Sequence, residues 1–383
     1  MANLFQKVEA SEGRLLARLR ELVEVESPSD NKAAVDRANA LVIDWAEAMG
    51  ANTVRHAQTG YGDVIELRFG ELDGFASQSK GVLLLGHLDT VWPLGTLAGM
   101  PWREDDGKIF GPGVVDMKAG VVMALEAIAA VRESGRSPRV TLLLNSEEEV
   151  GSPVSRSITE ALARKHDAVF VLEPAQGLAY KTARKGVGHF DLHIEGVGAH
   201  AGVDFEKGHS AVLEMARLVQ EVSTWTDLSR GLTVNAGVIA GGTRSNVIAA
   251  ECRAEVDVRV VSMSDAAEIE AKFQALRTSD PACRLTVTGG INRPPMERGA
   301  GTVALFEKAR GQAAELGFAL EEASTGGGSD GNFTAAVGVP TLDGMGAVGG
   351  GAHAAHEHVV KTHLVERTAM LAGMIAAIQG DNA

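Results

Sequence analysis

Three adjacent glutamates, Glu147, Glu148 and Glu149, follow the apolar run VTLLLN at 140–145 and precede Val150 and a glycine. Adjacent carboxylates repel one another, so an isolated acidic run is commonly a solvated turn after a strand. Whether this run has a chemical function instead cannot be decided from its three residues alone. The other polar segments of the chain decide between the two explanations.

Three of these segments stand at the ends of other apolar runs: GHLDTV (86–91), GPGVVDMKAG (111–120) and LEPA (172–175). Ligands of open α/β sheets collect beyond the carboxyl ends of the strands, so we expect the segments to converge. Convergence would gather His87, Asp89, Asp116, Glu173 and the glutamate run. Several carboxylates in a partly dry crevice cannot stay charged and unpaired, because desolvation is too costly. A divalent metal would neutralise them.

The residue types narrow the choice of metal. Nitrogen and oxygen ligands without thiolates suit zinc, manganese or cobalt. The chain has only Cys252 and Cys283, too few for a thiolate site or a disulfide framework. A second histidine ligand is expected, and the late segment GGGAHAAHEHVV (349–360) offers His353, His356 and His358.

The apolar patterns predict an α/β fold with an insertion. Helical spacing predicts two helices in the first 50 residues, and β-like runs follow at 63–69, 81–87, 139–145 and 168–173 with a helix between the second and third. This order predicts a mostly parallel, buried sheet. From 186 the strands alternate as half-exposed strands do, whereas a helix at 301–317, a strand near 340 and a helix at 362–377 resemble the first region. We therefore expect a catalytic domain formed by 1–185 and 295–383, with a smaller α+β domain inserted at 186–294.

Composition excludes several classes of protein. A chain of 383 residues exceeds the size at which single cores stop growing, which favours two domains. Its net charge of -14 and the lack of a Lys/Arg cluster argue against a nucleic-acid partner. The apolar runs are too short to span a bilayer, and the first residues have no apolar signal region, so a cytoplasmic protein is expected.

Taken together, the motifs resemble those of the di-zinc exopeptidase and deacylase family that includes glutamate carboxypeptidase, acetylornithine deacetylase and succinyl-diaminopimelate desuccinylase. The match runs in order along nearly the whole chain. It implies a catalytic domain of the zinc exopeptidase type, two Zn²⁺ ions per chain with Mn²⁺ or Co²⁺ as substitutes, and an inserted lid that dimerises. Five side chains are implied as ligands: His87 and Glu173 on one zinc, Glu149 and His353 on the other, and Asp116 bridging both.

The resemblance also implies roles around the ligands. Asp89 would accept the second ring N–H of His87. Aligning the family's acidic pair on Gly151 makes Glu148 the general base and leaves Glu147 as a solvated spectator. His353 is preferred to the other two histidines because the family has a glutamate four residues later, which Glu357 matches. His358 stands where the family often has a tyrosine, and His356 and His358 are expected at the surface.

In the inserted domain the resemblance implies residues that contact substrate. His200, in GVGAHAG at 196–202, would reach the partner subunit's site and polarise the scissile carbonyl. Asn246, Arg259 and Arg293 would hold a free substrate carboxylate, which suits the planar guanidinium group. Gly327, in TGGGSDG at 325–331, would line the cleft with backbone, and no lysine follows as a phosphate-binding loop requires.

These features favour hydrolysis of an amide whose leaving amine belongs to an amino acid with a free carboxylate. The best likeness is to glutamate carboxypeptidase, which releases a C-terminal glutamate. An N-acyl amino acid deacylase resembling acetylornithine deacetylase stays open, since both would use the same carboxylate clamp. A metal-binding protein without activity is a further alternative, which the retained base Glu148 disfavours.

Overall fold

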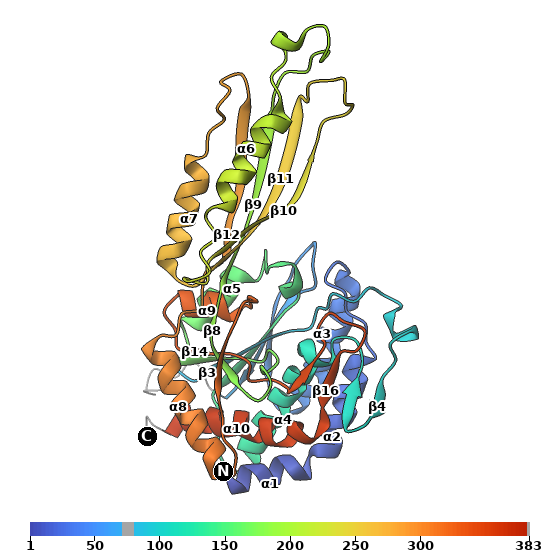
Figure 1. Cartoon of the computed structure of the whole chain (residues 1–383). Helices are drawn as coiled ribbons and strands as arrows, with labels where there is room; N and C mark the ends of the chain where they lie inside the picture. Colours follow the sequence, from blue (N-terminus) through green and yellow to red (C-terminus); the bar gives the residue numbers. More distant parts are fainter. Residues whose placement is uncertain (71–79, 381–383) are drawn as a thin grey trace. The chain divides into compact units, whose positions relative to one another are not determined.

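The computed structural model of the chain describes residues 1–70 and 80–380 and consists of two compact units (Figure 1). The large unit comprises Met1–Ala183, Arg298–Ser324 and Ser329–Ala383. The small unit comprises Arg184–Glu297 and the short segment Thr325–Gly328. The expected insertion at 186–294 did not include this short segment, which contains most of the glycine-rich motif.

A six-stranded sheet in the order β1-β2-β6-β3-β7-β14 forms the centre of the large unit. β3 pairs in parallel with β6 and β7, and β7 pairs in parallel with β14, whereas β1 and β2 run antiparallel to their neighbours. The predicted α/β fold with a mostly parallel sheet is confirmed. The strands are β1 (Asn52–His56), β2 (Val64–Phe69), β3 (Val82–His87), β6 (Val140–Asn145), β7 (Ala168–Val171) and β14 (Thr341–Leu342).

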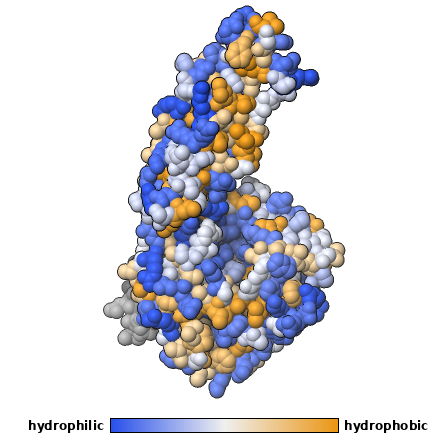
Figure 2. Space-filling view, in the orientation of Figure 1, coloured by the Kyte–Doolittle hydropathy of each residue, from blue (hydrophilic) through white to orange (hydrophobic). Residues whose placement is uncertain are grey.

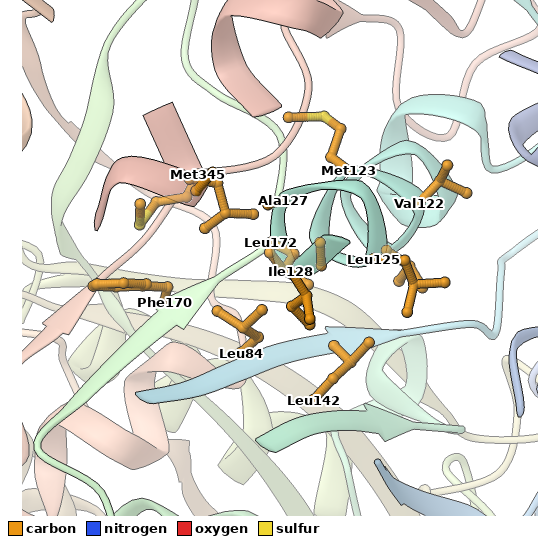
Figure 3. Packing of buried hydrophobic residues seen from close by; sticks show 14 of the residues in the cluster. Leu84, Val122, Met123, Leu125, Ala127, Ile128, Leu142, Phe170, Leu172 and Met345 are labelled. Atoms are coloured by element: carbon orange, nitrogen blue, oxygen red, sulfur yellow. The ribbon is translucent and has the colours of Figure 1, made fainter. Parts of the chain in front are cut away.

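Helices cover both faces of this sheet, so every residue of β3 and β6 is buried. Leu84 points to the face covered by α4 (Ala119–Glu133), where it shares the main core with Leu142 and Phe170 (Figure 3). Leu83 and Leu85 point to the other face and pack in a second core with Leu162 of α5 (Arg156–Ala163). Alternation between two apolar layers explains why these strands are continuous hydrophobic runs.

The remaining helices of the large unit complete these layers: α1 (Ala2–Ala10), α2 (Glu12–Val23), α3 (Lys32–Ala48), α8 (Ala300–Glu315), α9 (Gly331–Ala336) and α10 (Leu364–Gly380). The first 50 residues therefore hold three helices and not the two predicted. The missed helix is α1, which buries Leu4 and Val8 in the main core.

Two small sheets consist almost entirely of residues of the large unit. β4 (Arg103–Asp105), β5 (Lys108–Phe110), β16 (His358–Val360) and β15 (Gly349–Gly350) form one of them. β8 (Tyr180–Arg184) pairs with β13 (Glu322–Thr325) in the other. The antiparallel pair β15–β16 holds the two ends of the loop that carries His353.

The small unit is a four-stranded antiparallel sheet in the order β10-β11-β9-β12. Its strands are β9 (Gly186–Glu195), β10 (Thr233–Gly241), β11 (Glu251–Val260) and β12 (Arg284–Arg293). Alternate residues of β9 and β11 share one core with α6 (Ala211–Ser223) and α7 (Met263–Ala275). β10 is an edge strand, with most of its residues exposed.

No helix within residues 1–70 and 80–380 has the length and apolar character needed to cross a lipid bilayer.

Candidate metal centre

The sheet of the large unit brings the predicted ligands to one edge. His87 is the last residue of β3, Glu173 follows the end of β7, and the glutamate run follows β6. Because these three strands are parallel neighbours, their carboxyl ends lie side by side. Asp116 joins them from the irregular turn Val114–Lys118, which leads into α4.

Asp116 lies between the two predicted histidine ligands. Its Oδ1 is 3.3 Å from Nε2 of His87, and its Oδ2 is 3.5 Å from Nε2 of His353. His87 Nε2 is also 3.8 Å from Glu173 Oε1, and His353 Nε2 is 3.1 Å from Glu149 Oε2. Each oxygen of one carboxylate therefore faces a different imidazole, as a bridging ligand requires.

The possible ligand atoms are close enough together to share an ion. One atom from each of His87, Glu148 and Glu173 lies within 4.8 Å of the others, and the same holds for His87, Asp116 and Glu149. Among the described residues, His87 Nε2 and Asp116 Oδ1 are buried polar atoms without a hydrogen-bond partner. Buried polar atoms without partners are costly, so their position between carboxylates fits a bound cation.

The electrostatic field of the site favours positive charge. Burial alone would lower the pKa of His87, but the nearby carboxylates of Asp116 and Asp89 outweigh it, and the pKa lies well above its usual value. Hydrogen bonding to Asp116 and Glu149 raises the pKa of His353 to about 10. Burial would raise the pKa of Asp116, but the two imidazoles lower it. A set of imidazole and carboxylate donors with this excess of negative charge fits a divalent metal such as zinc.

Asp89 connects His87 to the glutamate turn. Nδ1 of His87 lies 3.0 Å from the backbone carbonyl oxygen of Asp89 and 3.4 Å from its Oδ1, which leaves Nε2 on the side of Asp116. The same carboxylate accepts hydrogen bonds from the backbone N–H groups of Glu148 (3.1 Å) and Glu149 (3.2 Å) and from the hydroxyl of Ser29 (2.6 Å). Asp89 therefore orients both the histidine and the turn, and its second contact was not predicted.

The prediction that Glu147 is solvated is wrong. Its side chain is buried, and Oε1 accepts hydrogen bonds from the backbone N–H groups of Val154 (3.1 Å) and Ser155 (2.7 Å) at the start of α5. Oε2 accepts a third from Ser146 N–H. Burial raises the pKa of Glu147. The carboxylate satisfies amides that a turn and a helix start would otherwise leave without partners, so its function is structural.

Glu357 holds the turn that carries Asp116. It is fully buried, and Oε2 accepts hydrogen bonds from the indole N–H of Trp92 (2.8 Å) and the backbone N–H of Gly113 (2.9 Å). Oε1 accepts from the backbone N–H groups of Val115 (2.9 Å) and Asp116 (3.2 Å). From the sequence, Glu357 served only to identify His353 as the histidine ligand. Its hydrogen bonds to the turn that carries Asp116 were not predicted.

Of the three late histidines, His353 is the one that contacts the predicted ligands. It lies in the loop between β15 and β16 with a left-handed φ of 62°. His358 instead lies in β16, where Nδ1 is 2.9 Å from the carbonyl oxygen of His356. Neither His356 nor His358 forms an ion pair with the cluster among the described residues.

The predicted substrate-contact residues lie in the small unit. His200 and Asn246 are exposed on neighbouring segments, joined by a hydrogen bond from Ala201 N–H to the Asn246 carbonyl oxygen (3.0 Å). Arg259 donates from Nε and Nη2 to the carboxylate of Asp257 on the same strand. The Nε and Nη2 atoms of Arg259, which could bind a substrate carboxylate together, are therefore already paired with Asp257. Arg293 is buried at the end of β12.

The glycine-rich segment is held by arginines of the small unit. Nη1 of Arg184 donates to the carbonyl oxygens of Gly327 (3.2 Å) and Gly328 (3.1 Å), and Nη1 of Arg259 donates to that of Gly326 (3.4 Å). Arg184 is buried and was not predicted. Its place directly before Lys185 in the motif YKTARKG gave no sign of this contact.

Comparisons with known proteins agree with this geometry. A model described as "Peptidase family M20/M25/M40" matches residues 83–377. Carboxypeptidase G2 of a Pseudomonas species is 28% identical over 97% of this chain and 91% of its own length. A probable carboxypeptidase of Arthroderma otae is 31% identical over 72% of this chain and 66% of its own.

Solved structures show the same fold. Aminopeptidase PepT from Bacillus cereus superposes with a TM-score of 0.80 at 21% identity and covers 96% of this chain and 98% of its own. An M20 family metallo-carboxypeptidase from Sulfolobus solfataricus gives a TM-score of 0.72 at 16% identity and covers 95% and 99%.

Proposed function

The chain belongs to peptidase family M20/M25/M40 and is a metallo-hydrolase, and we propose that it hydrolyses an amide bond to release a C-terminal amino acid, with glutamate as the amino acid released. The observation that carries this proposal is the position of Asp116, whose two carboxylate oxygens each face a different histidine. The similarity to carboxypeptidase G2 along nearly the whole chain supports a carboxypeptidase. The motif resemblance to glutamate carboxypeptidase supports glutamate.

We propose that two zinc ions bind per chain. His87 and Glu173 would hold one, Glu149 and His353 would hold the other, and Asp116 would contact both, which follows the pairs of short distances in the cluster. When bound, zinc lowers the pKa of a coordinated water and polarises a carbonyl group.

Side chains of this protein would carry out the proton transfers and bind the substrate. Glu148 accepts the proton of the attacking water and returns it to the departing amine nitrogen. Asp89 holds the backbone N–H groups of Glu148 and Glu149, so base and ligand keep a fixed relation. His200 donates a hydrogen bond to the developing oxyanion, and Arg293 binds the free carboxylate of the substrate with Asn246. Arg259 can contribute its two-nitrogen face only after it releases Asp257.

We further propose a cytoplasmic homodimer formed through the small unit. Edge strand β10 exposes Val238 (50%) and Ile239 (55%), and Leu213 of α6 is 54% exposed. Hydrophobic side chains gather on the visible face of this unit in Figure 2. An unpaired, apolar edge is a template for pairing with a second copy, so its burial in a symmetric dimer would remove a risk of aggregation.

A substrate panel tests the proposed activity. The zinc-loaded protein would be given acyl and aminoacyl glutamates, the same compounds with other C-terminal residues, their C-terminal amides, and acetylornithine. We expect hydrolysis of the glutamate compounds and little of the amides. Hydrolysis of acetylornithine without that of C-terminal glutamates would replace the proposal with a deacylase. Zinc binding without hydrolysis of any compound would indicate a metal-binding protein that lacks activity.

A further inference from the structure

Asp330 of the glycine-rich motif is buried beneath the glutamate turn of the large unit. It is 3% exposed. Its Oδ2 accepts a hydrogen bond from the side-chain amide of Asn145 (2.6 Å), and its Oδ1 accepts one from the hydroxyl of Ser152. A buried carboxylate makes strong hydrogen bonds in such surroundings, and removal of its charge leaves the donors without a partner of equal strength.

The two donors stand at opposite ends of the turn that holds the catalytic glutamates. Asn145 is the last residue of β6, and its backbone carbonyl oxygen accepts a hydrogen bond from Leu88 N–H (3.2 Å), next to His87. Ser152 follows Gly151, and its N–H donates to the carbonyl oxygen of Glu147 (3.0 Å). A single carboxylate thus connects the residue before the turn to the residue after it.

Ser152 needs such an anchor because its backbone is unfavourable. It has a φ of 58°, in the left-handed region that residues with a side chain rarely adopt. Gly151 before it also has a positive φ, of 92°. Side-chain contacts must stabilise a serine in this conformation, and Asp330 supplies the contact to its hydroxyl.

Asp330 also stands two residues after the segment that the arginines hold. Gly328 belongs to the small unit, where its carbonyl oxygen accepts from Arg184, and Ser329 belongs to the large unit, where its hydroxyl donates to Asp343 Oδ2 (2.6 Å). The chain therefore passes directly from the segment proposed to line the substrate cleft to the carboxylate beneath the glutamates.

We propose that Asp330 is a positioning residue of the hydrolytic site, which holds the turn 146–151 so that Glu148 and Glu149 keep their places relative to the metal ligands. The inference rests on the proposed function for its kinetic consequence, but its consequence for metal binding does not need an active enzyme. Asp330 acts through Asn145 and Ser152 and does not contact the reacting atoms.

The test compares Asp330→Asn with Asp343→Asn in the full-length protein. Both aspartates are buried, and Asp343 binds Ser329, the residue directly before Asp330. The hydrogen bonds of Asp343 also include those with Gly344 and Lys181, whereas those of Asp330 include the ones with Asn145 and Ser152 at the two ends of the glutamate turn. Zinc affinity would be measured by competition with a chromophoric chelator, stability by thermal unfolding, and kcat and KM on the best substrate of the panel.

We expect Asp330→Asn to lower zinc affinity and kcat by about 10- to 100-fold each, the usual effect of losing a residue that supports metal ligands, with KM changed less than about threefold. Asp343→Asn should lower the unfolding temperature without these losses. Ser152→Ala combined with Asp330→Asn should cost less than the product of the two single losses, since both remove the same contact.

Two results would overturn the inference: a folded Asp330→Asn protein with the zinc affinity of the wild type, or the same loss in Asp343→Asn at equal unfolding temperature. If the wild type hydrolyses no compound of the panel, the proposed function fails, and zinc affinity alone still decides the role of Asp330.

Discussion

At the scale of single residues, the three adjacent glutamates have different surroundings. Glu147 is buried in backbone hydrogen bonds, Glu149 lies against His353, and Glu148 has a carboxylate oxygen near His87 and Glu173. We predict that Glu148→Gln retains zinc but loses about 10²- to 10⁴-fold in kcat, as general bases do. Glu149→Gln should also lose affinity for one zinc. Zinc content and kcat, measured together for both variants, check this.

The assignment would be reversed if Glu148→Gln lost zinc while Glu149→Gln retained both ions. The comparison is informative because Glu148 and Glu149 each have a carboxylate oxygen within 4.8 Å of a ring nitrogen of His87. The neutral amide has nearly the shape of the carboxylate, so a loss reports the charge and not the packing.

A second residue-scale prediction concerns Glu147. Its three backbone donors cannot all be satisfied by an amide, because the amide nitrogen would face an N–H group. We expect Glu147→Gln to lower the free energy of unfolding by about 1 to 3 kcal/mol, the usual cost of an unsatisfied buried group. Urea unfolding measures this.

The matched control is Glu160→Gln on α5, where the carboxylate pairs with Arg156. This partly exposed ion pair should contribute less than about 1 kcal/mol. Equal destabilisation by the two substitutions would contradict the structural role of Glu147.

These residues show what the sequence could predict. The order of polar segments after apolar runs was sufficient to group His87, Asp116, Glu173 and the glutamate run, because parallel strands end at one edge of a sheet. The choice of Glu149 within the run and of His353 among the late histidines came from the family resemblance. It could not show that Glu147 turns inward, since the direction of a side chain in a turn depends on φ and ψ at the neighbouring residues. Glu147 has a φ of -153° and a ψ of 33°, a conformation that is visible only in the structure.

At the scale of elements, the turn Val114–Lys118 depends on Glu357. Four donors face its carboxylate, and two of them belong to Val115 and Asp116 within the turn. Glu357→Gln would place an amide nitrogen against some of these donors. We therefore predict that zinc affinity falls by about 10- to 100-fold, the range for residues that orient ligands.

Zinc affinity by chelator competition is the measurement, and Glu104→Gln on β4 is the control. Glu104 is partly exposed and pairs with Lys361, so it should bind zinc as the wild type does. Wild-type affinity in Glu357→Gln would show that the turn holds Asp116 without this carboxylate.

His166 connects α5 to β6, and its titration should make the stability of the protein depend on pH. Nδ1 of buried His166 lies 2.8 Å from the Leu162 carbonyl oxygen at the end of α5, and Nε2 lies 2.9 Å from the Thr141 hydroxyl of β6. Burial lowers the pKa of His166 below its value in the unfolded chain. Its contribution to stability is therefore full above about pH 6.5, the unfolded value, and is lost as the pH falls through the lower folded pKa.

We expect the wild type to lose stability between pH 7 and pH 5 relative to His166→Gln, which cannot titrate. The difference amounts to about 1.4 kcal/mol for each unit by which the folded and unfolded pKa values differ. Urea unfolding of both proteins at several pH values measures it. Parallel stability curves would mean that His166 does not titrate over this range.

Strands with continuous apolar sequences could be predicted from the sequence, whereas the short polar strand β1 could not. The runs that became β3, β6 and β7 are fully buried, so burial on both faces left a continuous hydrophobic signal. β1 has the polar sequence NTVRH and no fully buried residue, and it lies at one edge of the sheet. Its pairing with β2, and not its composition, makes it a strand.

At the scale of the whole molecule, the unpaired edge of β10 and the exposed His200 suggest a test of shared sites. If His200 serves the partner subunit's metal centre, His200→Ala and Glu148→Ala homodimers should both be nearly inactive. A heterodimer of the two has one centre in which Glu148 and the partner's His200 are both intact. Random exchange in an equal mixture makes about half of the dimers mixed, each with one intact centre of two.

We therefore predict that the mixture recovers about one quarter of wild-type activity, whereas each variant alone stays inactive at the same total concentration. Native mass spectrometry of chains with different tags would verify exchange. Recovery requires that the two residues act across the dimer, because no chain in the mixture carries both. If mixed dimers form without any recovery, His200 serves its own subunit or lies outside catalysis, and the dimer would then need another explanation than a shared site.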